Sequence, residues 1–278
     1  MMEAASPAKV NLHLRVIRKR PDGYHDIATL MQKIDLCDTM EFTLRKKGIV
    51  IKCPGFPQLE NEDNIVFRAA KALFLETGCQ SGAEIILHKV IPMGAGLGGG
   101  SSNAATALVA LNDMLGLSLS KEALMNIGAR LGADVPFFIY GDRAWAFGIG
   151  DRLEPAENLP PLWFVLVNPR FELATRRVYE GLNLRLTNQI INYSIPRFCT
   201  VTDVVKGLHN DLEKVSLTLY PALKELKDNL IGVGALGALM SGSGPTVYGV
   251  FEREDEALQA ADILKKNKNW FVTAVRSL

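Results

Sequence analysis

Alternation of apolar and polar residues predicts β-strands along much of the chain. In the segment 8–17 apolar side chains recur at every second position, as in a half-buried strand: Val10, Leu12, Leu14, Val16. Similar or continuous apolar patterns predict further strands over 27–36, 40–44, 83–91, 162–167, 235–240, 246–251 and 270–275. Residues 136–140 and 143–147 are predicted to pair as a hairpin across Gly141 and Asp142.

Helical spacing and capping residues predict the helices. Asn64 is a good N-cap for a helix through Glu76, and the apolar residues behind it fall on one face: Ile65, Ala69, Ala72, Leu73. Ser120 is predicted to cap a helix to Leu131, which Gly132 ends. Further helices are predicted over 104–115, 174–181, 202–208, 211–215, 220–230 and 255–266.

The order of these elements indicates an α+β fold, because strands are joined both to helices and to each other. A proline-rich stretch, Glu154-Pro-Ala-Glu-Asn-Leu-Pro-Pro, is the best candidate for a boundary. We therefore expect two domains, residues 1–154 and 155–278.

Composition changes the picture mainly by exclusion. A chain of 278 residues that is 48% hydrophobic can bury a sizeable core. The formal net charge is +1, so no general field favours nucleic acid or a membrane surface. Recognition of phosphate must therefore be local, and small molecules are the expected partners.

The cysteines and the apolar runs indicate a cytoplasmic protein, which we expect to be a monomer or a homodimer. Cys37, Cys53, Cys79 and Cys199 show neither a C-x-x-C pattern nor a histidine pair at metal-ligand spacing, so we expect free thiols and no metal held by protein ligands alone. The longest apolar runs are too short to span a bilayer, and the first residues lack the pattern of a signal peptide.

A glycine-rich segment between a predicted strand and a predicted helix is the strongest candidate for chemistry. It reads Pro92-Met-Gly-Ala-Gly-Leu-Gly-Gly-Gly-Ser-Ser-Asn-Ala-Ala. Glycines let backbone N–H groups approach a ligand closely, and a helix start favours anions, so the expected ligand is a phosphate chain. A dinucleotide loop needs a second strand with an acidic residue, and a Walker A loop needs a lysine; the segment lacks both. A flexible glycine linker is the bland alternative.

This loop resembles the phosphate loop of the GHMP kinase superfamily, which includes galactokinase, homoserine kinase and mevalonate kinase. Its extra glycines resemble most closely the branch of cytidyl-erythritol kinases. Two other segments agree in type and order: Ser6-Pro-Ala-Lys-Val-Asn-Leu resembles the amino-terminal motif, and Met240-Ser-Gly-Ser-Gly-Pro-Thr-Val-Tyr-Gly-Val-Phe resembles the carboxy-terminal one. The three motifs span residues 6 to 251, nearly the whole chain.

The resemblance implies a two-domain α+β GHMP kinase fold with the active site in the interdomain cleft. It also implies ATP-dependent phosphorylation, with Mg²⁺, of the 2-hydroxyl of a diphosphocytidyl methylerythritol in non-mevalonate isoprenoid precursor biosynthesis. The alternatives are another GHMP small-molecule kinase, such as a homoserine or phosphomevalonate kinase, and a nucleotide-binding regulator without catalysis.

The resemblance also implies roles for residues of the nucleotide site and the reaction centre. Asp134, which by its neighbours alone is either exposed in a turn or held for function, becomes the general base. Lys9, otherwise a surface lysine, becomes the cation that stabilises the migrating phosphoryl group. Asn64 is a weaker candidate for adenine, since its cap role explains it already. The loop residues implied to bind ATP are Pro92, Met93, Gly94, Ala95, Gly96, Leu97, Gly98, Gly99, Gly100, Ser101 and Ser102.

The acceptor site follows from the same resemblance. Asp22-Gly-Tyr24-His25 is a tight turn by composition, and in the resembling branch the tyrosine packs on cytosine while the histidine reads its edge. Asn11 shares a strand face with Lys9 and is expected to contact the acceptor. Tyr179 is a candidate for the other face of cytosine or, equally, a tyrosine of the helix core. Ser241 and Gly242 are expected to cover the acceptor, although a hairpin connection explains their loop as well.

Overall fold

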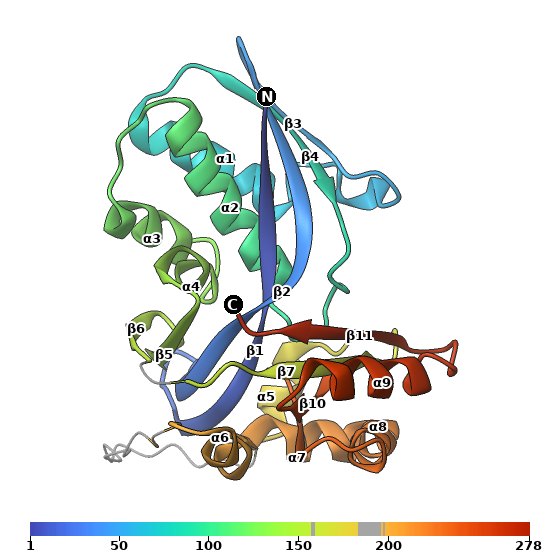
Figure 1. The fold of residues 1–278 in the computed structure, drawn as a ribbon. Coiled ribbons are helices and arrows are strands. Elements are labelled where there is room, and N and C mark those ends of the chain that lie inside the picture. The colour runs from blue at the N-terminus through green and yellow to red at the C-terminus, as the bar shows by residue number, and fades with distance from the viewer. Residues whose placement is uncertain (157–158, 183–195, 197) are drawn as a thin grey trace. The chain divides into compact units, whose positions relative to one another are not determined.

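The chain folds into two compact units of mixed helices and strands, as the α+β prediction requires (Figure 1). The computed structural model describes residues 1–156, 159–182, 196 and 198–278. Unit 1 comprises Met1–Ala8, Leu36–Ile91 and Gly98–Asp142, and unit 2 comprises Lys9–Asp35, Pro92–Leu97 and Arg143–Leu278. The sequence boundary expected after residue 154 is a different division of the chain and stays a prediction.

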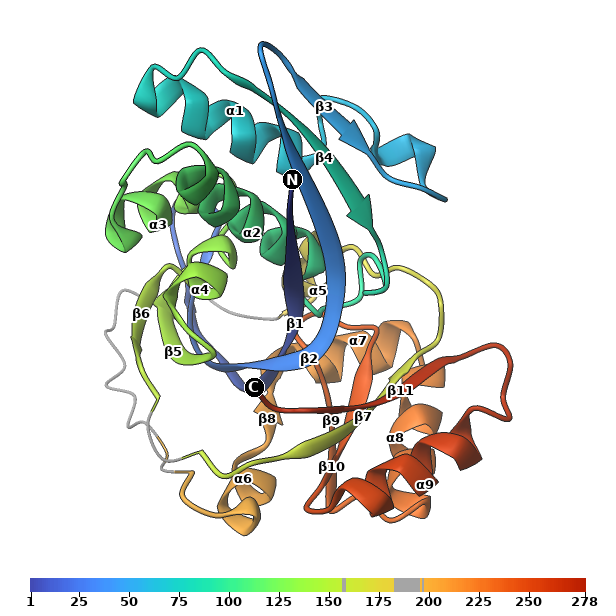
Figure 2. The same ribbon diagram turned by 45° about the horizontal axis from the view of Figure 1, so that its top comes forward.

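Unit 1 contains a helical group (Figure 2), and its two predicted caps are confirmed. Its helices are α1 (Ile65–Thr77), α2 (Gly99–Met114), α3 (Lys121–Ala129) and α4 (Val135–Tyr140). Asn64 Oδ1 accepts a hydrogen bond from Val66 N at 2.9 Å, and Ser120 Oγ accepts one from Ala123 N at 3.2 Å. Each side chain therefore satisfies a helix-start N–H group. The helices pack against one another, α1 on α2 and α4 on both α2 and α3.

The predicted hairpin of residues 136–140 with 143–147 is wrong in its first half. Residues 135–140 form α4, with Pro136 in the first turn, where a missing N–H group costs no hydrogen bond. A short apolar run fits a buried strand or a buried helix equally well, so periodicity could not decide. Residues 143–148 do form a strand, β5 (Arg143–Gly148), which pairs with the beginning of β2 (His25–Arg45) and with β6 (Arg152–Pro155).

The longest strands run through both units. The first, β1 (Met2–Lys19), extends beyond the predicted segment 8–17 at both ends. The second, β2, is longer than predicted because the segments 27–36 and 40–44 belong to one strand. In unit 1 the end of β2 pairs with β4 (Gly82–His88), which also pairs in parallel with β3 (Ile49–Lys52) beside a 3₁₀ turn at Pro57–Leu59. In unit 2, β1 pairs in parallel with β8 (His209–Asn210).

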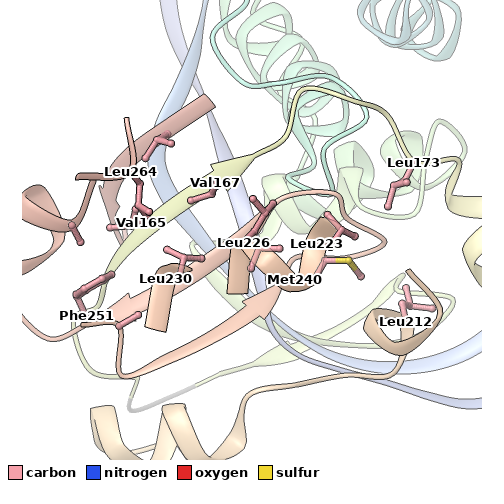
Figure 3. Close-up of a cluster of buried hydrophobic side chains, with 14 of the residues drawn as sticks. Val165, Val167, Leu173, Leu212, Leu223, Leu226, Leu230, Met240, Phe251 and Leu264 are labelled. Atoms are coloured by element: carbon pink, nitrogen blue, oxygen red, sulfur yellow. The ribbon is translucent and has the colours of Figure 1, made fainter. Parts of the chain in front are cut away.

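Unit 2 also contains an antiparallel sheet in the order β11-β7-β10-β9. These strands are β7 (Trp163–Asn168), β9 (Gly237–Met240), β10 (Val247–Phe251) and β11 (Phe271–Arg276). Side chains alternate between the two faces of this sheet. One face packs against α8 (Ala222–Gly232) and α9 (Glu254–Leu264). The buried cluster between them is shown in Figure 3 and includes Val165, Val167, Leu226, Leu230 and Phe251. The described part of unit 2 also contains the helices α5 (Thr175–Glu180), α6 (Val201–Gly207) and α7 (Asp211–Leu219).

The opposite face of this sheet carries Phe164 and Tyr248, whose rings meet edge to face with centroids 5.5 Å apart. The Tyr248 hydroxyl donates a hydrogen bond to the backbone oxygen of Asn11 at 2.8 Å. Burial raises the pKa of Tyr248 well above its usual value, so the phenol stays a donor. The sheet thus holds β1 at the residues that the sequence selects for the site.

Candidate active site

The glycine-rich segment forms a turn that ends at the start of α2. Gly94, Gly96 and Gly98 have φ values of 57°, 76° and 70°, a region that L side chains rarely adopt. Gly98 is the N-cap of α2, and no side chain caps this helix. A helix start of this kind is a place where anions commonly bind in proteins. The loop is a built segment and not a linker.

Gly96 is the point where the loop, β1 and the second glycine-serine loop meet within unit 2. A Cβ atom on Gly96 would lie 2.1 Å from Ser241 O, so only glycine fits. The Gly96 carbonyl accepts hydrogen bonds from Ser241 Oγ at 2.9 Å and from Lys9 Nζ at 3.1 Å. The backbone N–H of Lys9 donates to Leu97 O at 3.0 Å. Lys9 is therefore fixed on the phosphate loop by both its backbone and its side chain.

The surface reading of Lys9 is wrong, because Lys9 is only 4% exposed. Its ammonium group donates to Asn11 Oδ1 at 2.6 Å, which confirms that the two side chains share a strand face. A buried ammonium group is expensive unless oxygens solvate it, so this position is maintained by several neighbouring groups.

Asn11 is held from several directions. Its Nδ2 donates to Thr29 Oγ1 at 2.9 Å, and its backbone N–H donates to Ser241 Oγ at 3.3 Å. Tyr248 also donates to the backbone oxygen of Asn11, so these contacts fix both its backbone and its side-chain amide. Sequence reasoning missed Thr29 and Tyr248, because they support the site from other strands and no motif spacing marks them.

Asp134 lies in unit 1, directly before α4. It is half-buried, and its side chain does not cap the helix that follows. The turn before it is close to the start of α2, since a Cβ atom on Gly132 would lie 3.9 Å from Ser101 Oγ. The general-base role stays a prediction, and its segment borders the loop residues implied to bind phosphate.

Both ends of the Asn64 side chain are hydrogen-bonded to the backbone. Besides the cap bond to Val66 N, its Nδ2 donates to Leu59 O at 2.7 Å. The cap reading is confirmed, and the contact with adenine stays a prediction.

The predicted turn before His25 is confirmed. Gly23 has a φ of 88°, and the N–H of Tyr24 donates to Asp22 Oδ1 at 3.1 Å. Tyr24 is 63% exposed, whereas the ring of His25 lies beside that of Tyr179, with centroids 5.1 Å apart and planes tilted by 33°. Tyr179 also packs against the core of unit 2, so its two alternatives are compatible. Burial, with a smaller effect of Lys19, lowers the pKa of His25.

The loop after Met240 is a hairpin connection between β9 and β10, as the alternative for Ser241 and Gly242 requires. Ser241 is fully buried, and Asn210 Nδ2 donates to both Met240 O and Gly242 O at 2.8 Å. This loop therefore directs the Ser241 hydroxyl at Gly96, and the contact of Ser241 and Gly242 with an acceptor stays a prediction.

A phosphate chain and its metal ion fit this chemistry. Among the described residues no group of three or more His, Cys, Asp or Glu side chains could hold a metal ion by itself. Mg²⁺ commonly needs only one or two protein oxygens besides phosphates and water, so an ion carried by a nucleotide suits the site.

Within the residues that the structure describes, the four cysteines are free, and none of the helices has the length and apolar character of a membrane span.

Comparison with known proteins gives a consistent family. The model of the GHMP kinases N terminal domain matches residues 64–142, and that of the GHMP kinases C terminal domain matches residues 202–269. A 4-diphosphocytidyl-2-C-methyl-D-erythritol kinase of Syntrophus aciditrophicus is 59% identical over the whole of both chains. A protein of the same name from Syntrophotalea carbinolica is 51% identical, covering 97% of this chain and 96% of its own.

Solved structures agree with the sequences. A crystal structure of 4-(cytidine 5'-diphospho)-2C-methyl-D-erythritol kinase has a TM-score of 0.83 and 34% identity, with 99% of each chain covered. A homoserine kinase from Cytophaga hutchinsonii has a TM-score of 0.72 at 21% identity, covering 100% of this chain and 94% of its own, which shows a shared fold alone. The chain belongs to the GHMP kinase superfamily and, within it, to the 4-diphosphocytidyl-2-C-methyl-D-erythritol kinases.

Proposed function

We propose that the protein transfers the γ-phosphoryl group of ATP to the 2-hydroxyl of 4-diphosphocytidyl-2-C-methyl-D-erythritol, a step of non-mevalonate isoprenoid precursor biosynthesis. The observation that carries the proposal is the buried ammonium group of Lys9 on the Gly96 carbonyl. A phosphate loop without its own lysine needs a cation nearby to neutralise the phosphates. Lys9, on strand β1, would supply this positive charge. The substrate itself is taken from the names of the relatives with 51–59% identity.

In the proposed reaction, Asp134 accepts the proton of the 2-hydroxyl while the oxygen of that hydroxyl attacks the γ-phosphorus. The bond from that phosphorus to the bridging oxygen breaks, and ADP leaves. Lys9 stabilises the charge on the transferring oxygens, and the N–H groups at the start of α2 hold the phosphates. A positioned carboxylate contributes about 10²–10⁴ in rate. The support for Asp134 is the closeness of its turn to Ser101.

Mg²⁺ bound to the phosphates would supply further neutralisation of their charge, and the loop serines Ser101 and Ser102 are the candidates to hold it. The free energy of binding would come mainly from the phosphates, since the described part of the chain offers no cluster of carboxylates for the ion.

Tyr24, His25 and Tyr179 form the proposed cytosine site, with Asn11 on the acceptor. The lowered pKa of His25 keeps its imidazole neutral at pH 7, so that one ring nitrogen accepts a hydrogen bond and the other donates. One nitrogen of the neutral ring together with the peptide group of His25 suits the base edge of cytosine, which offers both an acceptor nitrogen and an amino group. The exposed ring of Tyr24 and the neighbouring ring of Tyr179 support stacking on the base.

The proposal includes action in the cytoplasm, as a monomer or homodimer, with ATP and the cytidyl compound as partners. Its support is the free state of Cys37, Cys53, Cys79 and Cys199, which suits a reducing compartment.

The test is ATP turnover by the purified protein with the cytidyl compound, homoserine and phosphomevalonate in parallel. We expect ADP release and a new phosphomonoester with the cytidyl compound alone. Turnover of homoserine or phosphomevalonate instead would identify another GHMP kinase. Tight ATP binding without turnover of any acceptor would favour a regulator without catalysis.

A further inference from the structure

A buried polar cluster in unit 1 shares Ser102 with the residues implied to bind ATP and otherwise lies outside the residues assigned to the site. It consists of Ser6 on β1, Asp38 on β2, Lys89 after β4, and Ser102 and Asn103 on α2. Asp38 is fully buried, Asn103 is 2% exposed and the side chain of Lys89 is 6% exposed. Burying an ion pair costs several kcal/mol of desolvation, and apolar residues would stabilise the fold equally well, so the cluster calls for another explanation.

Asp38 joins the two ends of the phosphate loop. Its Oδ1 accepts hydrogen bonds from the N–H groups of Val90 at 2.7 Å and Ile91 at 2.9 Å, the last residues before Pro92. Its Oδ2 accepts from Nδ2 of Asn103, in the second turn of α2, at 2.9 Å, and from Lys89 Nζ. One carboxylate therefore fixes the chain on entry to the loop and on exit from it.

The other members extend this connection to the residues implied to bind ATP. Lys89 Nζ donates to Asn103 Oδ1 at 3.1 Å, and Asn103 Nδ2 also donates to Ser6 Oγ at 2.9 Å. Ser6 Oγ in turn donates to Ser102 Oγ at 2.9 Å. A Cβ atom on Gly99 would lie 3.4 Å from Lys89 Nζ, so the ion pair lies directly beneath the first turn of the helix.

We propose that Asp38, Lys89 and Asn103 are positioning residues that preorganise the phosphate loop for the nucleotide. Fixing both ends of the loop reduces the conformational entropy that nucleotide binding must remove. The pairing of Asp38 with Lys89 also neutralises a carboxylate that would otherwise repel phosphates close to α2. The proposal rests on the assignment of this loop to ATP, and it concerns nucleotide affinity and not the choice of acceptor.

The main test compares two buried asparagines on the same helix. Asn103→Ala removes hydrogen bonds to Asp38, Lys89 and Ser6. Asn112→Ala is the matched control, because Asn112 is 7% exposed and bonds Leu119 N at 3.0 Å near the other end of α2. Calorimetry with a non-hydrolysable ATP analogue measures binding without any acceptor, and thermal unfolding measures stability.

We expect Asn103→Ala to raise the Kd of the analogue by about tenfold, as the loss of one or two net hydrogen bonds predicts, and Asn112→Ala to leave it within about twofold. Both variants should unfold at lower temperature than wild type. Equal effects of the two substitutions on the Kd, or none, would overturn the proposal. Failure of wild type to phosphorylate the cytidyl compound would instead overturn the proposed function, since this binding test uses no acceptor.

A second variant keeps the proposal falsifiable if Asn103→Ala does not fold. Ser6→Ala removes only the hydroxyl that joins Asn103 to Ser102. We expect a rise of about two- to fivefold in the KM for ATP with an unchanged KM for the acceptor, and a substitution by threonine, which restores the hydroxyl, should recover the ATP value. An unchanged KM for ATP in Ser6→Ala, or an equal rise for both substrates, would contradict a positioning role.

Discussion

The nucleotide half and the acceptor half of the candidate site are built in different ways. In the proposed function, the nucleotide half would rely on consecutive backbone N–H groups at the start of α2 in unit 1, with Asp134 nearby in the same unit. The proposed acceptor half would rely on side chains from separate segments of unit 2: Lys9, Asn11, Tyr24, His25, Tyr179, Ser241. A continuous motif can therefore specify the first half, whereas the second depends on tertiary packing. Substitutions should accordingly change different kinetic parameters.

The largest expected effect concerns Asp134. Asp134→Asn keeps the size of the side chain and removes the proton acceptor, so kcat should fall by roughly 10²–10⁴ with the affinity for ATP nearly unchanged. Asp142→Asn, the same change just after α4, is the control and should keep wild-type turnover. Near wild-type kcat in a folded Asp134→Asn enzyme would show that Asp134 is not the general base.

Lys9 tests the acceptor half in the same way. Lys9→Met fills similar space without the charge, and loss of one electrostatic stabiliser should lower kcat by roughly 10²–10³. Lys33, another buried lysine of unit 2, is the matched control, and Lys33→Met should retain turnover. Equal kcat in the two variants would show that Lys9 serves packing alone.

Gly98 separates strain in the backbone from contact with phosphate. Gly98→Val adds a β-branched side chain at the N-cap of α2, so the Kd for ATP should rise by about 10- to 100-fold while binding of the cytidyl compound changes little. Gly78→Val is the matched control, because Gly78 has a φ of 65° against 70° at Gly98 and caps the end of α1. Titration calorimetry on each ligand measures both effects. Similar losses of ATP affinity in the two variants would mean that the loop is only structural.

The smallest effect is expected at Ser241. Ser241→Ala removes the hydrogen bond to Gly96 O, and kcat/KM should fall by about two- to tenfold. Ser216→Ala removes another buried bond to the same loop, at Ser243 O, and should leave kcat/KM unchanged. A large and selective rise in the acceptor KM of Ser241→Ala would show direct contact with the acceptor, as the family resemblance implies.

Much of the fold, including the glycine-rich turn before α2, could be predicted from local sequence, because caps and glycine loops act through neighbouring residues. Asn64 and Ser120 are examples. The burial of Lys9 could not be predicted, since alternation in β1 assigns it to the polar face; packing from other segments of unit 2 covers that face as well. For the same reason no local signal marks Asp38 or Asn103, whose partners lie 14 to 97 residues away in sequence.

The central claim is that the acceptor half reads cytosine for phosphoryl transfer. The most direct measurement is kcat/KM for the cytidyl substrate and its uridyl analogue, on wild type and on His25→Ala. A site that pairs with the base edge should favour the cytidyl compound by roughly 10⁴ in wild type, and His25→Ala should lose most of this preference with the KM for ATP unchanged. Equal use of both compounds by wild type would contradict the account.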